Sequence, residues 1–437
     1  MKPRPSLTRR EFFGLAGAGA LAPLLAGRGR AATKAGLIQN PLFSVTQIPD
    51  LPFTDASAPS RHLGVETLLQ LMGRQGLKFY RSALITSLGG PQGLVAADDV
   101  VLLKVNAQWK YRGATSSDVV RGIVQRVLEH PDGFRGEVVI FENGQGRGSL
   151  NCDTRGGGAY ADNAVHANAV DERHSFLYLV DQVFKDPRVS AYLLDPVRGI
   201  FIGAADHVTQ GYRKLENVSY PCFTTARGTR VELKEGIWTG AGYAQNLKLI
   251  NVPVLKTHGG SEITGALKHF YGVLSMDDGQ SSFRHYAGHG ETVGKMVALV
   301  RPPVLNVLDC VWVSQGALGG YPAGSTFKAN RLVGGQDPLA IDYWASKHIL
   351  YPVNKKAGHN PDNATIQGWM NAAQAVMNGR SLKELASGLQ IDAVTKNENE
   401  ILVYEAAAGT TPPDGGREPP QAAERDPKDR APRKVIL

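Results

Sequence analysis

The stretch Asp98-Asp-Val-Val-Leu-Leu-Lys-Val-Asn106 is an apolar run that ends in polar residues. Short apolar runs without helical spacing are typical of buried strands. A helix is expected next, because Thr115-Ser-Ser-Asp118 can cap a helix and residues 119–128 carry one apolar stripe. A second apolar run follows at 137–142. Since a strand–helix–strand unit normally closes right-handed into a parallel sheet, this stretch predicts an α/β fold.

The rest of the chain continues this alternation of strands and helices. The apolar patterns predict strands at 247–255 and 304–311, and helices at 62–75, 175–185, 263–271, 339–349, 364–377 and 382–389. Asp337 and Pro338 are typical of the cap and the first residue of such a helix. We therefore expect an α/β protein of two lobes, with mostly parallel sheets flanked by helices and a loop-rich insertion at about 143–244.

Both ends of the chain predict segments outside this fold. Thr8-Arg9-Arg10-Glu11-Phe12-Phe13, followed by a short apolar stretch, is typical of a twin-arginine (Tat) signal peptide, which we place at residues 1–31. It predicts export by the Tat translocase to a periplasmic or extracellular location. Residues 409–437 are rich in proline, glycine and charge and predict a disordered tail. The expected domain spans 32–408, with a helical C-terminal extension at 353–408.

Composition argues against several classes of protein. The net charge is +8, but residues 1–31 hold six basic residues against one acidic residue, so the remainder lacks the basic excess of a nucleic-acid-binding protein. No segment has the roughly 20 apolar residues that a membrane-spanning helix needs, so an integral membrane protein is not expected. Three cysteines without a C-x-x-C motif argue against an iron–sulfur cluster.

Cationic residues gather where the predicted strands end. Lys256 and His258 lie two residues apart at the end of strand 247–255, and Lys104 and Asn106 end the first strand with the same spacing. Residues at this spacing point to the same side of a strand, and ligands of α/β proteins collect at the carboxyl ends of the strands. Buried lysines cost free energy unless an anion offsets their desolvation. We therefore expect Lys104, Asn106 and Lys256 to bind an anionic substrate.

Lys268 and His258 are the candidate catalytic residues in this region. A desolvated lysine can hold an anion or form a covalent adduct, and a histidine can move protons. The competing interpretations are an exposed helix lysine for Lys268 and a loop-holding hydrogen bond for His258. Thr115 begins a helix whose amides could receive an anion, which makes it a candidate substrate-binding residue. Helix capping is the simpler role for Thr115.

A second basic cluster is Arg284-His285-Tyr286-Ala-Gly-His289. Here Arg284 is a candidate substrate-binding residue and His285 a candidate catalytic residue. His258 and His285 are also candidate metal ligands, although the sequence identifies no cofactor. The run Gly144-x-Gly146-x-Gly148 invites a nucleotide-binding interpretation, but no G-x-G-x-x-G motif exists and no helical pattern follows. Motifs of serine hydrolases, zincins and P-loop NTPases are lacking in the sequence.

Five segments, taken in order, resemble the domain-of-unknown-function 362 family (DUF 362) over residues of about 60–352. They are D-V-V-L-L-K-V-N (99–106), N-V-P-V-L-K-T-H (251–258), T-G-A-L-K-H-F-Y-G (264–272), the strand 304–309, and G-Q-D-P-L-A-I-D (335–342). His269 departs from the asparagine that is usual in the family. The ferredoxin-type cysteines of other members are lacking in this sequence.

A more distant likeness is to the nickel-dependent lactate racemase family. His258, Lys268 and His285 are similar in order to a histidine, a lysine that carries a covalent nucleotide cofactor, and a nickel-binding histidine of that family. The residues before Lys268 differ, and the last spacing is about one residue longer. The resemblance implies a shared fold and, if it extends further, a cofactor on these residues.

The sequence thus predicts an exported enzyme that acts on a small anionic, carboxylate-type molecule in a cationic cleft between two lobes. Two alternatives stay open: a non-catalytic periplasmic binding protein for an anionic ligand, and a carrier of a metal or covalent cofactor. Ligand consumption distinguishes an enzyme from a binding protein. The mass of the protein from its native host reveals a covalent cofactor.

Overall fold

The computed structural model describes residues 39–54, 60–154, 163–275, 287–321, 323–410 and 434–436. The expected signal peptide, Arg284 and His285 lie outside the described residues. Most of the expected tail also lies outside them, but Lys434–Ile436 forms a short strand, β18, that pairs with β17 (Ile401–Ala407). None of the described helices is long and apolar enough to cross a membrane.

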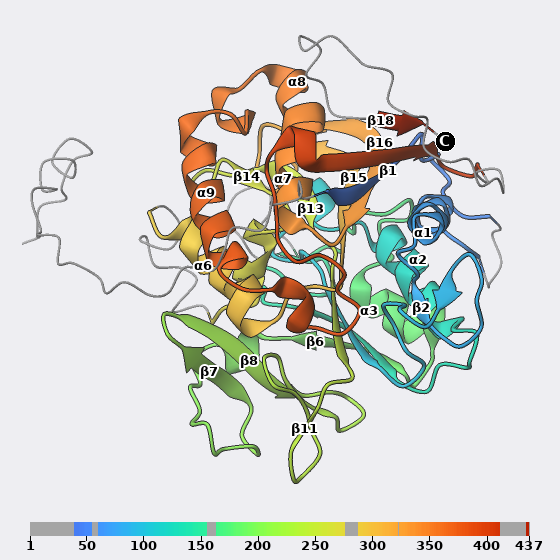
Figure 1. Ribbon diagram of the computed structural model, residues 1–437, viewed down its shortest axis with the longest axis vertical. Helices are drawn as coiled ribbons and strands as arrows, with labels where there is room; N and C mark the ends of the chain where they lie inside the picture. Colours follow the sequence, from blue (N-terminus) through green and yellow to red (C-terminus); the bar gives the residue numbers. More distant parts are fainter. Residues whose placement is uncertain are drawn as a thin grey trace, which may run out of the picture. The chain divides into compact units, whose positions relative to one another are not determined.

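A mixed sheet of 11 strands is the centre of the fold, with the main order β18-β17-β1-β16-β15-β12-β4-β5-β6 and with β13 and β14 beside β15 (Figure 1). Most neighbours are parallel, while β16 runs antiparallel to β1 and β15, and β14 to β13. The remaining strands are β1 (Asn40–Thr46), β4 (Val100–Lys104), β5 (Glu137–Glu142), β6 (Val189–Leu193), β12 (Leu247–Asn251), β13 (Val254–Thr257), β14 (Ile263–Thr264), β15 (Leu305–Ser314) and β16 (Thr326–Gly335).

The predicted strand–helix–strand unit is confirmed. Strands β4 and β5 pair in parallel, with Lys104 opposite Phe141. Helix α2 (Ser117–Leu128) connects them, and the Ser116 hydroxyl caps it by accepting from Val119 N. Strand β12 lies on the other side of β4, so that Asn251 and Lys104 are neighbours at the same strand end. The carboxyl ends of β12, β4 and β5 therefore lie at one edge of the sheet.

Helices cover both faces of the sheet, which confirms the α/β class (Figure 1). Alternate residues of β4 divide between two hydrophobic clusters: Leu102 lies in the cluster with α6, α7 and α9, and Leu103 in the cluster with α1 and α2. The helices in these clusters whose bounds have not yet been given are α1 (Leu63–Arg74), α6 (His289–Lys295), α7 (Pro338–Ala345) and α9 (Ala364–Asn378). Asp337 caps α7 and Pro338 opens it, as the sequence predicts.

The expected loop-rich insertion contains more regular structure than its sequence indicates. Helix α3 (Phe176–Tyr178) continues as the π-helical turn Leu179–Phe184, which matches the expected helix. A five-stranded antiparallel sheet then forms, drawn in green in Figure 1. Its strands are β7 (Gly211–Leu215), β8 (Val218–Thr224), β9 (Arg230–Glu232), β10 (Gly236–Trp238) and β11 (Tyr243–Ala244). Outside this insertion, a two-stranded sheet joins β2 (Tyr80–Arg81) and β3 (Gly89–Gly90).

Three predicted elements differ from the structure. The strand expected at 247–255 is divided into β12 and β13. Pro253 lies between them and has no N–H to donate to a neighbouring strand. Only its carbonyl is used, as the acceptor for Asp309 N. The helix expected at 263–271 is instead β14 followed by a 3₁₀ turn, Lys268–Gly272. Only the 3₁₀ turn Leu382–Glu384 forms where a helix was expected at 382–389.

Candidate functional site

A cavity of about 390 Å³ opens at the carboxyl edge of the large sheet. Lys104 of β4, Glu142 of β5 and Lys256 of β13 contribute to its wall, and the turn after β14 adds Lys268. Its other lining residues are Asn106, Gln108, Asn143, Gln145, Arg147, His258, Gly260, Thr264, His269, Tyr271, Gly272 and Leu318. The three lysines that the sequence singles out therefore converge on one cavity.

Lys104 is buried and its ammonium group is fully committed to the protein. Its Nζ donates to Val105 O at 2.8 Å and to Glu142 Oε2 at 2.9 Å, and lies 3.1 Å from His269 Nε2. An ammonium has three N–H donors, so these contacts use all of them. Burial lowers the pKa of Lys104 and raises the pKa of Glu142 to about 7. Two backbone amides also donate to Glu142, from Ala107 and Asn143, which supports its ionised form.

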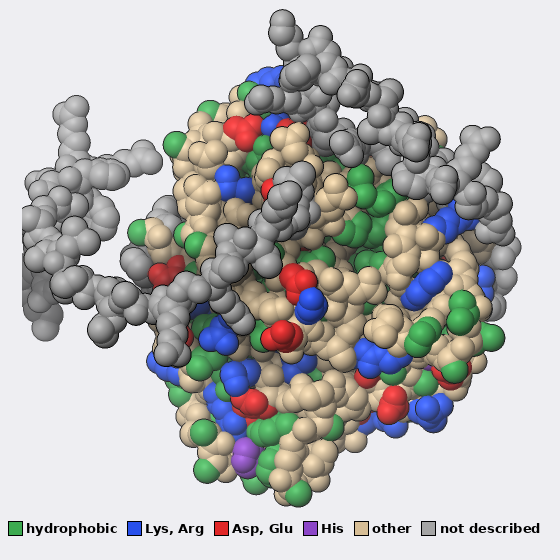
Figure 2. All heavy atoms as spheres, in the orientation of Figure 1, with side chains coloured by type: hydrophobic (Ala, Val, Ile, Leu, Met, Phe, Trp, Pro, Cys, Tyr) green, Lys and Arg blue, Asp and Glu red, His purple; other side chains and the backbone are tan. Residues whose placement is uncertain are grey.

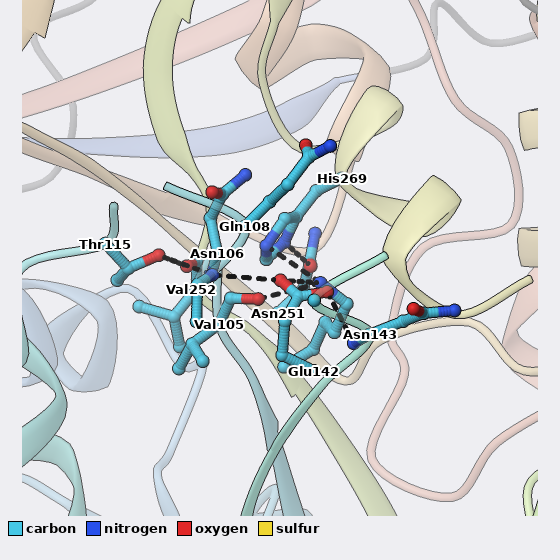
Figure 3. A network of polar contacts seen from close by, with 12 residues as sticks. Val105, Asn106, Gln108, Thr115, Glu142, Asn143, Asn251, Val252 and His269 are labelled. Carbon is cyan, nitrogen blue, oxygen red and sulfur yellow. Dashed lines mark hydrogen bonds and ion pairs between the residues drawn. The ribbon is translucent and has the colours of Figure 1, made fainter. Parts of the chain in front are cut away.

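His269 is held in one tautomer by its neighbours (Figure 3). The amide nitrogen of Asn251 donates to Ala266 O and to Asn306 Oδ1, so its Oδ1 accepts from His269 Nδ1 at 2.7 Å. His269 Nε2 is then the acceptor for Lys104. Burial and the charge of Lys104 hold the pKa of His269 well below its usual value, which keeps the ring neutral. His269 therefore serves as an uncharged link between Lys104 and Asn251.

Lys256 is buried, and the described residues supply only two acceptors for its ammonium group. Its Nζ donates to Gly113 O at 2.5 Å and, more weakly, to Asn106 Oδ1 at 3.4 Å. Burial lowers its pKa to about 7, and the nearby Lys104 acts in the same direction against the opposing charge of Glu142. One N–H of the ammonium is therefore left for a ligand in the cavity. An anion there would favour the charged form of Lys256.

Lys268 is placed by a turn that Asp342 holds from helix α7. Asp342 accepts from Ala266 N at 2.5 Å and from Leu267 N at 3.0 Å. A Cβ at Gly265 would lie 2.2 Å from Asp342 Oδ1, so the glycine makes room for the carboxylate. These contacts join the T-G-A-L-K and D-P-L-A-I-D segments in space. They explain why a lysine expected on a helix is presented by a 3₁₀ turn.

The Lys268 amine faces the cavity without a hydrogen bond or ion pair to any residue in the described part of the chain. Its Nζ lies 3.4 Å from the centroid of the Tyr271 ring. Burial and the charge of Lys256 hold the pKa of Lys268 well below its usual value. Its environment therefore differs from that of the other two lysines, which donate to oxygen atoms.

His258 is half-buried, and one nitrogen of its ring is a hydrogen-bond acceptor within its own loop. Its Nδ1 accepts from Gly260 N at 3.1 Å and from Ser261 N at 3.3 Å. In the neutral ring the proton is therefore on Nε2. The structure confirms that His258 holds its loop through Nδ1; the residue also lines the cavity, where its catalytic role stays a prediction.

Asn106 and Thr115 have different positions relative to the cavity. Asn106 lines it, whereas Thr115 is buried behind the wall. The Thr115 hydroxyl donates to Val252 O at 2.7 Å and accepts from Asn106 N at 2.8 Å (Figure 3). Thr115 thus braces the end of β4 against the connection between β12 and β13. Ser116, and not Thr115, caps α2.

The glycine-rich loop after β5 binds a carboxylate of the protein itself. Asp195 accepts from Gly144 N at 2.6 Å and from Gly146 N at 2.5 Å. These amides are therefore occupied, which removes the basis for phosphate binding by them. The same loop places Arg147 at the cavity, with its guanidinium exposed and without a hydrogen bond or ion pair among the described residues.

Sequence reasoning missed several polar residues of the wall, among them Gln108, Glu142, Asn143 and Arg147. Glu142 and Asn143 follow an apolar run just as Lys104 and Asn106 do, so the rule of polar strand ends could have identified them. Arg147 gave no such signal, because its position depends on how the glycine loop folds. Gln108, which donates to Gln145 at 2.9 Å, likewise lies beyond a strand end in irregular structure.

The described residues add no further ligand to His258 and His285, the candidate metal ligands predicted from the sequence. Across the described ranges, no group of three or more His, Cys, Asp or Glu side chains is arranged to hold a metal ion. His285, the proposed partner of His258, and Arg284 lie outside those ranges. The three cysteines are free and buried.

Comparison with known proteins identifies one family. Residues 219–347 match the model described as "Domain of unknown function (DUF362)". The match supports the predicted DUF362 resemblance over this segment of the chain. No curated protein and no solved structure matches the chain.

The DUF362 match divides the wall of the cavity into two parts. Lys256, His258, Lys268 and His269 lie inside the matched segment, as does the supporting Asp342. Lys104, Glu142 and Arg147 precede it in the chain. The matched segment thus supplies Lys256, Lys268 and both histidines of the wall. The preceding strands β4 and β5 supply the buried ion pair between Lys104 and Glu142.

Proposed function

We propose that this protein binds a small anionic, carboxylate-type molecule in the cavity and acts on it as an enzyme. The observation that carries the proposal is the convergence of Lys104, Lys256, Lys268 and Arg147 on a wall with one carboxylate, Glu142, which Lys104 already pairs. This local excess of positive charge contrasts with the outer surface, where basic and acidic side chains are interspersed on the face drawn in Figure 2.

The roles of Lys104, Lys256 and Arg147 follow from their contacts. Lys104 supports the wall, because the protein uses its three donors. Among the described residues, Lys256 and Arg147 have donors left for an anion, whereas burial lowers the pKa of Lys268 and so favours its neutral amine. Each charge-assisted hydrogen bond contributes about 1.5–3 kcal/mol. His258, whose Nε2 carries the proton in the neutral ring, is suited to exchange a proton with the bound molecule.

Binding of a small carboxylate such as oxalate, lactate or succinate is expected to tighten as pH falls from about 8 to about 6, by at most about tenfold per pH unit for one linked proton. An anion favours charged Lys256, whose pKa is about 7, so binding takes up a proton. Protonation of Glu142 in the same range removes a negative charge and acts with the same sign. The titratable and charged groups of the wall are Lys104, Glu142, Arg147, Lys256, His258, Lys268, His269 and Tyr271.

Isothermal titration calorimetry in Hepes and in Tris measures both the affinity and the proton uptake. Lys256→Met is expected to weaken binding about 10- to 100-fold, which corresponds to one charge-assisted contact. Lys347→Met is the matched control, because this lysine pairs with Glu398 outside the cavity. Affinity that is independent of pH, or equal loss in both variants, would contradict the proposal. Binding without consumption of any ligand would indicate a non-catalytic binding protein.

We also propose that the chain is exported through the Tat pathway, on the basis of Arg9 and Arg10 in the N-terminal motif. Changing both residues to lysine is expected to retain the protein in the cytoplasm of a Tat-competent bacterium, as measured by cell fractionation. The matched control changes Arg28 and Arg30 to lysine, which preserves the motif. Unchanged export of the Arg9/Arg10 variant would contradict a twin-arginine signal.

A further inference from the structure

We propose that Lys268 Nζ forms an imine with the carbonyl carbon of a small 2-oxo acid, whose carboxylate is bound by the cations of the same cavity. The inference rests on the proposed function, since it requires that the cavity admit a small carboxylate. It adds a substrate class and a covalent role for one residue.

The first argument is the difference between the three lysines. Lys104 Nζ has three polar partners, and Lys256 Nζ has two oxygen acceptors. Lys268 Nζ has no such partner among the described residues, although only 5% of the residue is exposed. A buried amine that faces a cavity without an acceptor is available to a ligand there. Lys268 is therefore the lysine whose reaction would break no hydrogen bond or ion pair seen in the structure.

The second argument is the protonation state of Lys268. Only the neutral amine is a nucleophile. Burial holds the pKa of Lys268 well below its usual value, because desolvation disfavours the ammonium, and the charge of Lys256 acts in the same direction. The Tyr271 ring opposes this, because an aromatic face attracts a cation by about 0.5–2 kcal/mol, or about one pKa unit. Desolvation is the largest effect on this pKa, so the neutral amine of Lys268 is favoured more than that of an exposed lysine.

The third argument is the separation of tasks within the wall. A 2-oxo acid presents a carboxylate beside an electrophilic carbonyl carbon. Lys256 and Arg147 have donors for the carboxylate, and Lys268 has the lone pair for the carbonyl. The volume of about 390 Å³ is near the lower end of ligand pockets, which suits a molecule of few atoms. A charged neighbour that suppresses protonation of the reacting lysine is a recognised way to activate it.

The reaction balances without an oxidant or reductant. The Nζ lone pair forms a bond to the carbonyl carbon while the C=O π electrons move to oxygen, which takes a proton. The resulting carbinolamine loses its hydroxyl group as water after a second proton transfer, and the nitrogen lone pair forms the C=N bond. In sum, the neutral amine, the 2-oxo acid and one proton give a protonated imine and one water molecule.

Reductive trapping tests this inference on the full-length protein. Incubation with pyruvate or glyoxylate and sodium cyanoborohydride is expected to add one reduced adduct per chain, which peptide mapping places on Lys268. Lys268→Met should lose at least about nine-tenths of this label. Lys248→Met is the matched control, because Lys248 is also buried, with a pKa lowered to about 8, but does not line the cavity. This control variant should label like the wild type.

The outcomes separate the imine from the proposed function. If pyruvate and lactate bind in calorimetry but no adduct forms, the imine is wrong and anion binding stands. If neither binds and no adduct forms, both proposals fail. Label on Lys256, or equal label on Lys248 and Lys268, would overturn the assignment to Lys268. Protection by lactate, which has the carboxylate but no ketone, is the expected result if the two ligands share the cavity.

Discussion

Replacing Lys104 by methionine is expected to lower the free energy of unfolding by about 3–5 kcal/mol, the usual cost of removing one partner of a buried ion pair. Both Lys104 and Glu142 are almost fully buried, with Nζ and Oε2 2.9 Å apart. Without the lysine, Glu142 keeps two amide donors but loses the charge that offsets its burial. Val105 O and His269 Nε2 also lose their donor. Urea denaturation followed by circular dichroism measures the loss.

Two control variants show whether the loss comes from the unpaired charge. Lys104→Met combined with Glu142→Leu is expected to recover part of the stability, because hydrophobic replacement of a whole buried pair is often neutral. Lys295→Met should change stability by less than about 1 kcal/mol, because its pairs with Glu216 and Glu291 are near the surface. A loss below about 1 kcal/mol for Lys104→Met would mean that the pair contributes little to folding.

Part of the site could be predicted from sequence because strand ends are local features. An apolar run followed by a polar residue indicates where a strand stops, and parallel strands bring their ends to one edge. This reasoning placed Lys104 and Lys256 correctly in one cavity. Applied to 137–142, it would also have found Glu142, the partner that makes the burial of Lys104 tolerable.

Other features depend on contacts between distant parts of the chain. Strand β1 lies between β16 and β17, which pair residues 40–46 with residues near 330 and 401–407. Nothing in the local pattern of residues 40–46 specifies those partners. The antiparallel sheet was also missed, because its strands are short and give little alternating pattern. In the same way, the helical spacing of 263–271 was misleading, because Asp342 binds the amides of this segment from another element.

Replacing Asp342 by alanine is expected to lower the free energy of unfolding by about 2–6 kcal/mol, because Ala266 N and Leu267 N lose their acceptor and each unsatisfied buried N–H costs about 1–3 kcal/mol. Burial raises the pKa of Asp342 to about 7, above its unfolded value of 3.8. The stability gained from this raised pKa is fully present below the unfolded value and is lost as pH rises through the folded value. The difference between variant and wild type should therefore be larger at pH 5 than at pH 8 in urea denaturation.

The same substitution should also displace Lys268 and reduce its trapping with pyruvate, which a purely structural aspartate would not do. Asp337→Ala is the matched control, because Asp337 accepts from two amides at the start of the same helix but does not contact the turn before Lys268. It should lower stability without lowering the trapped fraction of folded protein. Should Asp342→Ala fail to fold, Gly265→Ala provides a second route, since its Cβ would displace the same carboxylate. Normal trapping in folded Asp342→Ala or Gly265→Ala would show that Lys268 is positioned by other contacts.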